Sequence, residues 1–139
     1  MQENPLVSII CLAFNHEKFV VETLNSVVEQ NYQPIELIIV DDCSTDNTKL
    51  VINNWLLSHP EVQFIVNEAN RGNTKSFNNA LKFAKGEYII DLAADDLIVP
   101  NGIELQINAF QNSKYQNLGV VYGNAEIINE DGSFNSYYF

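Results

Sequence analysis

The sequence has 139 residues, of which 46% are apolar, and its formal net charge is −11. A chain of this length and composition is one domain with a core of its own. The charge argues against nucleic acid as a partner, because nucleic acid binds to basic surfaces. No stretch approaches the roughly 20 apolar residues of a membrane-spanning helix, and the N-terminus has no secretory signal pattern. Cys11 and Cys43 are not spaced as a metal-binding pair, and we expect a cytoplasmic location.

Apolar runs and helical periodicities alternate along most of the chain. We predict strands over residues 6–13, 35–40, 62–66 and 87–93, and helices over residues 14–30, 44–58, 75–85 and 101–112. Asn15 and either Ser44 or Thr45 are the expected caps of the first two helices, and Gly86 is expected just beyond the third. The alternation predicts a parallel sheet with helices on both faces.

The last part of the chain has a different pattern. Residues 118–129 are predicted to form one or two strands, and Asp131-Gly132 is the turn of a hairpin whose second strand begins at Phe134. The chain stops in the aromatic run 137–139, which we interpret as a truncation.

Two pairs of neighbouring aspartates follow predicted strands. Asp41-Asp42 ends the second strand within IIVDDCSTDNT, and Asp95-Asp96 follows the fourth within YIIDLAADDL. In parallel α/β sheets, ligands bind at the carboxyl ends of the strands, near the point where the strand order reverses. We therefore expect both pairs to face one crevice.

The turn after the first strand, LAFNHEK, disfavours the common nucleotide-binding folds. It has no glycine, whereas dinucleotide folds and P-loops need a glycine-rich turn at this place. A nucleotidyltransferase with a related sheet would also carry a glycine-rich and basic loop there. A phosphorelay receiver would carry its pair of acids at the end of the first strand, whereas this strand ends in AFN.

Together these motifs resemble the family-2 glycosyltransferases of the GT-A fold. In that family the first strand ends in Pro, then Ser or Thr, then Tyr-Asn, and the second strand leads into Val-Asp-Asp-Gly-Ser. The corresponding stretches here are LAFN and VDDCS. NRGNTKSFNNA is similar to the family's N-x-G motif, GEYIIDLAADD to its acidic D-x-D-type motif, and YGNAEIINEDG to the stretch beyond it. The resemblance covers nearly the whole chain and implies a Rossmann-like, mostly parallel α/β sheet.

The resemblance also implies a function. The chain would be the donor-binding part of a hexosyltransferase of polysaccharide biosynthesis, which moves a sugar from a UDP-, GDP- or dTDP-linked donor to a saccharide or lipid-linked acceptor. An aspartate of the first pair would accept the N–H of the base, and Asp95 would face the ribose. The implied nucleotide-binding residues are Ala13, Phe14, Asn15, Asp41, Asp42, Asn70, Gly72, Lys75 and Asp95. The alternative for Asp42 is a purely structural cap on the loop near Ser44.

A diphosphate is difficult to bind in a chain with a net charge of −11. Two like charges about 4 Å apart repel by roughly 4 kcal/mol at an effective dielectric constant near 20. A divalent cation reverses the sign, and Mg²⁺ commonly takes one or two protein carboxylates plus substrate phosphates. The resemblance implies that Asp96 holds Mn²⁺ or Mg²⁺. The alternative is that Asp95 and Asp96 only favour the dipole of the following helix.

Three positions depart from the family pattern. Leu12, Ala93 and Phe77 stand where the family commonly has Pro, Asp and Arg. Without that arginine, Lys75 or Arg71 is the remaining candidate to face the donor phosphates. The departures also support an alternative function, a non-catalytic module that binds a nucleotide sugar or serves as a scaffold for a partner.

The sequence offers no convincing general base for the transfer. Inverting members of the family use an Asp or Glu beyond the acidic motif, but Glu130 and Asp131 belong to a predicted turn, and Glu126 has no supporting motif. We expect the base and the acceptor half beyond Phe139, in a full-length inverting enzyme that can work at the inner face of the membrane. His16, in the first turn of the first predicted helix, is expected on the surface.

Overall fold

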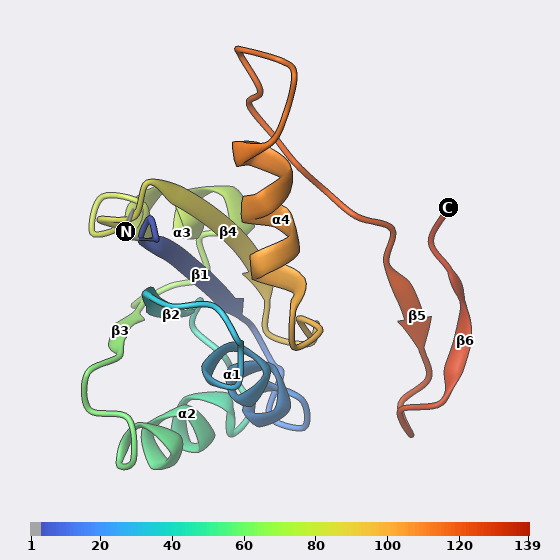
Figure 1. The fold of residues 1–139 in the computed structure, drawn as a ribbon. Helices are drawn as coiled ribbons and strands as arrows, with labels where there is room; N and C mark the ends of the chain where they lie inside the picture. Colours follow the sequence, from blue (N-terminus) through green and yellow to red (C-terminus); the bar gives the residue numbers. More distant parts are fainter. Residues whose placement is uncertain (1–3) are drawn as a thin grey trace. The chain divides into compact units, whose positions relative to one another are not determined.

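The computed structural model describes residues 4–139, which divide into two units between residues 103 and 104. The first unit contains β1 (Val7–Ala13), α1 (Val20–Val28), β2 (Ile35–Asp41), α2 (Thr48–Leu56), β3 (Gln63–Val66), α3 (Asn73–Ala80) and β4 (Tyr88–Ala93) (Figure 1). α4 (Gly102–Gln111) begins at its end, and β5 (Glu126–Ile128) and β6 (Phe134–Tyr137) belong to the second unit. The predicted alternation of four strands with four helices is confirmed. None of the helices described is long and apolar enough to cross a membrane.

The four strands of the first unit form one parallel sheet in the order β3-β2-β1-β4. β1 is central, with Val7 in register with Ile35 on β2 and with Tyr88 on β4. All seven residues of β1 are buried, which explains why its sequence is a continuous apolar run and not an alternating one. Along the chain, β2 pairs with one edge of β1 and β3 pairs with β2, whereas β4 pairs with the other edge of β1. The strand order therefore reverses between β1 and β4.

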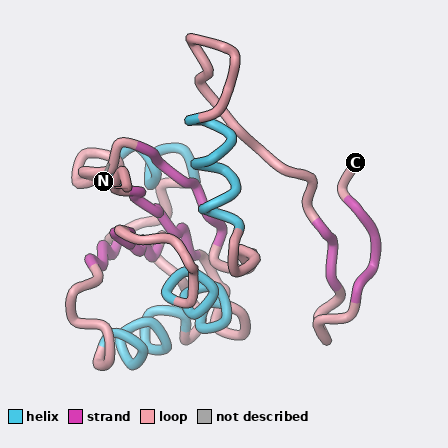
Figure 2. Tube along the Cα trace, viewed as in Figure 1, coloured by secondary structure: helices cyan, strands magenta, loops and turns pink. Residues whose placement is uncertain are grey.

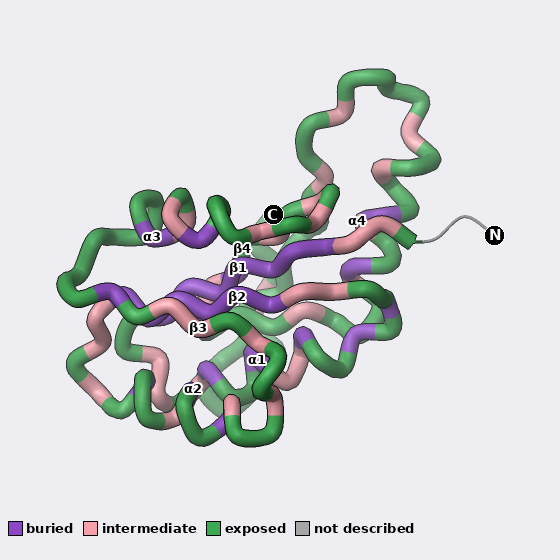
Figure 3. The backbone as a smooth tube through the Cα atoms, turned by 90° about the vertical axis from the view of Figure 1, so that its left-hand side faces the viewer, coloured by how far each residue is buried: buried purple, intermediate pink, exposed green. Residues whose placement is uncertain are grey.

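The helices cover both faces of this sheet, as predicted. α1 and α2 lie on one face and α3 on the other (Figure 3). Beneath α3, Ile10 and Leu12 of β1 pack with Ile38 and Val40 of β2 and with Ala80. Most of these residues are β-branched or small, which suits a pleated surface that a helix approaches closely.

The first two helices begin later than their sequence patterns predict. α1 begins at Val20, and Asn15 is not its cap: the φ of Asn15 is 60°, and its side-chain oxygen accepts hydrogen bonds from the backbone N–H and hydroxyl of Thr45. α2 begins at Thr48, and neither Ser44 nor Thr45 caps it. Asn15 and Ser44 therefore bind the neighbouring turn instead of capping their own helix.

Gly86 is required because the segment before β4 closely approaches the start of β1, and not because a helix ends there. α3 ends at Ala80, so the predicted role of Gly86 just beyond the third helix is wrong. Gly86 lies against the start of β1, where its N–H donates a hydrogen bond to the hydroxyl of Ser8 at 2.7 Å. A Cβ atom at this position would lie 2.5 Å from the backbone nitrogen of Ser8 and 2.9 Å from the carbonyl oxygen of Leu6.

We predict that Gly86→Ala lowers the free energy of unfolding by about 1–3 kcal/mol, because the new methyl group meets backbone atoms that cannot move aside. Urea unfolding followed by circular dichroism measures the change. Gly119→Ala is the matched control, since nothing lies within 4 Å of the place that its methyl group would take. Equal effects of the two substitutions would contradict the steric explanation.

The second unit ends in the predicted hairpin. β5 and β6 pair antiparallel, and Gly132 in the turn has a φ of 82°. The N–H and hydroxyl of Ser133 both donate hydrogen bonds to the carboxylate of Asp131. The strand predicted over residues 118–129 forms only at its end, and residues 118–125 are irregular (Figure 2). Val120 and Tyr122 of that segment are exposed, so no burial supports a strand there.

Candidate nucleotide-sugar site

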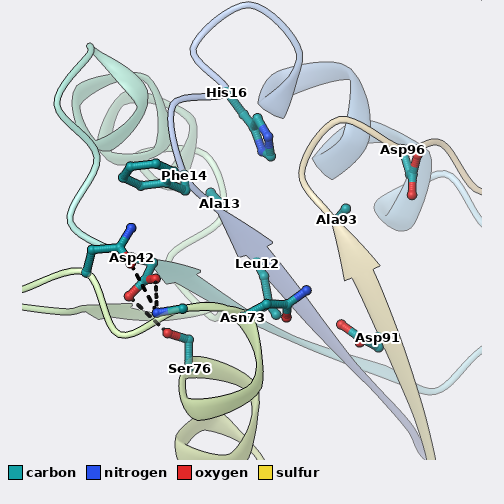
Figure 4. A pocket seen from close by; sticks show the side chains of 12 residues that line it. Leu12, Ala13, Phe14, His16, Asp42, Asn73, Ser76, Asp91, Ala93 and Asp96 are labelled. Carbon is teal, nitrogen blue, oxygen red and sulfur yellow. Dashed lines mark hydrogen bonds between the residues drawn. The ribbon is translucent and has the colours of Figure 1, made fainter.

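A cavity of about 460 Å³ opens at the carboxyl ends of β1 and β4, where the strand order reverses. This is the place at which parallel α/β sheets bind ligands. Its lining residues are Leu12, Ala13, Phe14, His16, Asp42, Asn70, Gly72, Asn73, Ser76, Asp91, Ala93 and Asp96 (Figure 4). One aspartate from each predicted pair, Asp42 and Asp96, lines the same cavity.

The structure separates the predicted nucleotide-binding and metal-binding residues into two groups. Those that line the cavity are Ala13, Phe14, Asp42, Asn70, Gly72 and Asp96. Those that do not line it are Asn15, Asp41, Lys75 and Asp95. The side chains of Lys75 and Arg71, the two candidates for the donor phosphates, are exposed outside the lining. Phe77 packs against the hydrophobic core beneath α3.

The turns after β1 and β2 are tied to each other and form one wall of the cavity. The backbone N–H of Asn15 donates to the hydroxyl of Ser44 at 3.0 Å, and the N–H of His16 donates to the hydroxyl of Thr48 at 2.8 Å. The side-chain oxygen of Asn15 accepts from the N–H of Thr45 at 2.8 Å. Asn15 therefore supports the wall from outside the cavity and does not line it.

The two aspartates at the end of β2 have different partners. Asp41 is 1% exposed, and its carboxylate accepts a hydrogen bond from the N–H of Ser44 at 3.2 Å. Its second oxygen has no partner among the described residues. The alternative role considered for Asp42 is a structural cap on the loop near Ser44. In the structure, Asp41 makes that contact.

Asp42 instead connects β2 to the loop that precedes α3. Its carboxylate accepts hydrogen bonds from the N–H groups of Arg71 (2.9 Å) and Gly72 (2.8 Å), the Asn67 amide (2.7 Å) and the Ser76 hydroxyl (3.0 Å). Burial acts to raise the pKa of Asp42, but these four hydrogen bonds together outweigh it and hold the pKa below its ordinary value. Three of the four donors bind Oδ1 of this carboxylate, and only the N–H of Gly72 binds Oδ2. Oδ2 can therefore accept another hydrogen bond.

We predict that Asp42→Asn lowers the free energy of unfolding by about 2–3 kcal/mol at pH 7, because an amide cannot accept all four hydrogen bonds. The folded-state pKa of Asp42 is depressed, so its ionised form stabilises the fold above the ordinary value of 3.8. That stabilisation is lost as the pH falls through the lower folded-state pKa. The difference between the variant and the unsubstituted protein should therefore narrow in acid.

Urea unfolding between pH 7 and pH 3 measures this difference. Glu61→Gln, which changes an exposed carboxyl, is the matched control and should shift stability by less than about 0.5 kcal/mol. A loss of stability for Asp42→Asn that stays constant over the whole pH range would show that the charge of Asp42 contributes nothing.

The loop that carries the second aspartate pair is anchored from α1 and from the turn that follows it. The Gln30 amide group donates to the carbonyl of Val99 at 2.8 Å, and the Ser26 hydroxyl accepts from the N–H of Ile98 at 3.2 Å. The N–H of Asp96 donates to the carbonyl of Ala93 at 3.1 Å, which closes a tight turn at the end of β4. Gln30 is buried, and its anchoring role is not evident from its polar side chain at the end of a predicted helix.

The electrostatics of this loop suit a divalent cation. The pKa of Asp96 is raised, first by burial and then by the neighbouring charge of Asp95, against a weaker opposite effect of His16. An ionised carboxylate in this environment would gain from a cation close by. The described residues contain no group of three or more side chains that could hold a metal by themselves. The protein fits a site that offers Asp96 and leaves the remaining positions to the phosphates of a ligand.

Two chemically important lining residues were not identified from the sequence. Asp91 of β4 points toward the cavity, and burial raises the pKa of its carboxyl (Figure 4). It lies two residues before Ala93 and so on the same face of the strand, which is the signal that could have found it. His16 is not a surface residue of a first helical turn. It precedes α1, its side chain is 24% exposed, and its imidazole lines the cavity.

Comparison with solved structures identifies the class of protein to which this fold and site belong. A mannosyltransferase from Pyrobaculum calidifontis, in complex with GDP-Man and Mn²⁺, superposes with a TM-score of 0.70 at 29% identity over 84% of this chain and 34% of its own. S. aureus TarS in complex with UDP gives a TM-score of 0.68 at 26% identity over 88% of this chain and 41% of its own. The fold is that of the GT-A glycosyltransferases.

The sequence comparison is more specific. The family model "Glycosyl transferase family 2" matches residues 8–136, and the chain belongs to this family. An Escherichia coli relative, UDP-Glc:alpha-D-GlcNAc-diphosphoundecaprenol beta-1,3-glucosyltransferase, is 36% identical over 91% of this chain and 48% of its own length. Pasteurella multocida hyaluronan synthase is 37% identical over 93% of this chain and 13% of its own. The chain spans less than half the length of either relative.

Proposed function

We propose that this chain binds the nucleotide-diphospho-sugar donor of a metal-assisted glycosyltransferase. The observation that carries the proposal is the single cavity that Asp42 and Asp96 share at the reversal of the strand order, in a member of glycosyl transferase family 2. Solved structures of similar fold contain GDP-Man, UDP or UDP-GlcNAc, which supports a nucleotide-sugar ligand.

The lining residues suit the parts of such a donor. Phe14 is 42% exposed and offers an aromatic face to a base. The carboxylate oxygen of Asp42 that binds Gly72 can accept the N–H of the base. Asn70 and Asn73 can donate and accept hydrogen bonds with hydroxyl or phosphate groups. Asp95, beside the cavity, is proposed to face the ribose.

We assign the metal position to Asp96. Mn²⁺ or Mg²⁺ held there would supply positive charge to the diphosphate and to the charge that develops on the departing nucleoside diphosphate. Asp96 itself contributes a carboxylate at the cavity wall, and the anchored turn after β4 keeps that carboxylate in place.

The remaining features of the transfer are proposals that rest on the family. We propose an inverting transfer of a hexose to a saccharide or lipid-linked acceptor, with the general base and the acceptor site outside the donor cavity. The setting would be polysaccharide synthesis on the cytoplasmic side of a membrane.

A second function is favoured by two departures from the family pattern. Phe77 packs against the hydrophobic core at the position where a positive charge is expected, and residue 93 offers no carboxylate. A non-catalytic module that binds a nucleotide sugar would tolerate both changes. Turnover of a nucleotide sugar by the full-length protein excludes this alternative, and binding without turnover supports it.

We predict that the protein binds one of UDP, GDP and dTDP in the presence of Mn²⁺, and that a chelator weakens this binding at least tenfold. Asp96→Ala should have a similar effect in Mn²⁺, because it removes the carboxylate assigned to the metal. Isothermal titration calorimetry with each nucleotide measures both changes.

Glu61→Ala, an exposed carboxyl outside the cavity, is the control and should leave the affinity within about twofold. Tight binding that is indifferent to the chelator and to Asp96→Ala would contradict the role assigned to Asp96. The absence of binding for all three nucleotides would contradict the donor site itself.

A further inference from the structure

The cavity holds three carboxylates and one imidazole. Asp42, Asp91 and Asp96 line it, and His16 is the one residue of the lining that can carry a positive charge. Lys75 and Arg71 lie outside the lining. The basic group that lines this cavity therefore comes from the turn after β1.

The fold places His16 at the cavity through its backbone. Its N–H donates to the hydroxyl of Thr48 at 2.8 Å, and its carbonyl accepts from the N–H groups of Phe19 and Val20, both at 3.0 Å. The imidazole projects from this anchored turn toward the interior of the cavity (Figure 4). A ring on a backbone held from three directions is preorganised for a ligand.

The fold makes little use of the two ring nitrogens of His16. Nδ1 is buried and has no hydrogen-bond partner among the described residues. Nε2 lies 3.8 Å from a carboxylate oxygen of Asp95, which is beyond hydrogen-bond distance. An imidazole carries an N–H on Nε2 in its protonated form and in one of its two neutral tautomers, so Nε2 can donate to a ligand in either charge state.

We propose that His16 is a donor-binding residue whose imidazole N–H donates a hydrogen bond to a phosphate oxygen of the nucleoside diphosphate. It provides, from the turn after β1, the phosphate contact that residue 77 cannot make from the core. This inference rests on the proposed donor site and adds a specific residue to it.

The test compares the affinities for a nucleoside diphosphate and for the nucleoside of the same base. The base is the one for which the unsubstituted protein has the highest affinity. His16→Ala should lower the affinity for the nucleoside diphosphate roughly tenfold to a hundredfold, as expected for a lost hydrogen bond to a charged group. It should change the affinity for the nucleoside by less than about twofold, because the nucleoside has no phosphate. Calorimetry measures the first affinity, and NMR chemical-shift titration measures the second.

His16→Gln is the conservative variant. Its amide N–H can reach the region of the imidazole Nε2, so it should recover part of the affinity that His16→Ala loses. Lys82→Ala removes a positive charge from an exposed position away from the cavity and is the matched control. The melting temperature of each His16 variant separates a loss of ligand binding from a loss of the fold.

The outcomes separate this inference from the proposed function. An unchanged affinity of His16→Ala for the nucleoside diphosphate overturns the role of His16 and leaves the donor site standing. Equal losses for nucleoside and nucleoside diphosphate also overturn it, because the residue would then only shape the turn. If the unsubstituted protein binds no nucleoside diphosphate, the proposed function fails and this inference fails with it.

Discussion

The hydrogen bonds to the Asp42 carboxylate are the interaction on which the site depends most. They join the end of β2 to the loop before α3, two segments that are about thirty residues apart in the chain. Without that connection Asn70 and Gly72 would not be held at the cavity wall beside β1. A carboxylate that accepts four hydrogen bonds is an effective connector, because each bond to a charged group is stronger than a neutral one. The same residue can therefore both build the wall and face the ligand.

Charge is the second constraint. The cavity is lined by acids in a chain of net charge −11, although the fold suits a ligand that is itself anionic. Burial and the charge of Asp95 raise the pKa of Asp96, so its ionised form is less favourable than that of a free carboxyl. Such a site is consistent with ligand and cation binding together, since each relieves the repulsion that the other would meet. The imidazole of His16 lines the same cavity and can donate a hydrogen bond to an anionic ligand there.

Local sequence patterns predicted the elements better than their ends. The apolar runs of β1 and β2 are long and continuous, and both strands lie where they were expected. The start of α1 was misplaced by six residues because Asn15 resembles a cap but binds Thr45 of another turn. The prediction for Gly86 was wrong for a similar reason: its requirement comes from Ser8, far away in the chain. Residue pairs of this kind have no signature in either local stretch.

The sequence by itself determined the parallel α/β class, the two acid pairs at strand ends and the family, because periodicity and short motifs are local properties of the chain. Only the tertiary structure decided which residues meet. It placed Asp42 and Asp96 at one cavity and left Asp41 and Asp95 outside its lining. It also brought His16 into that cavity. The reason is that the direction of a side chain at a strand end depends on hydrogen bonds with neighbouring loops, and these form only when the sheet assembles.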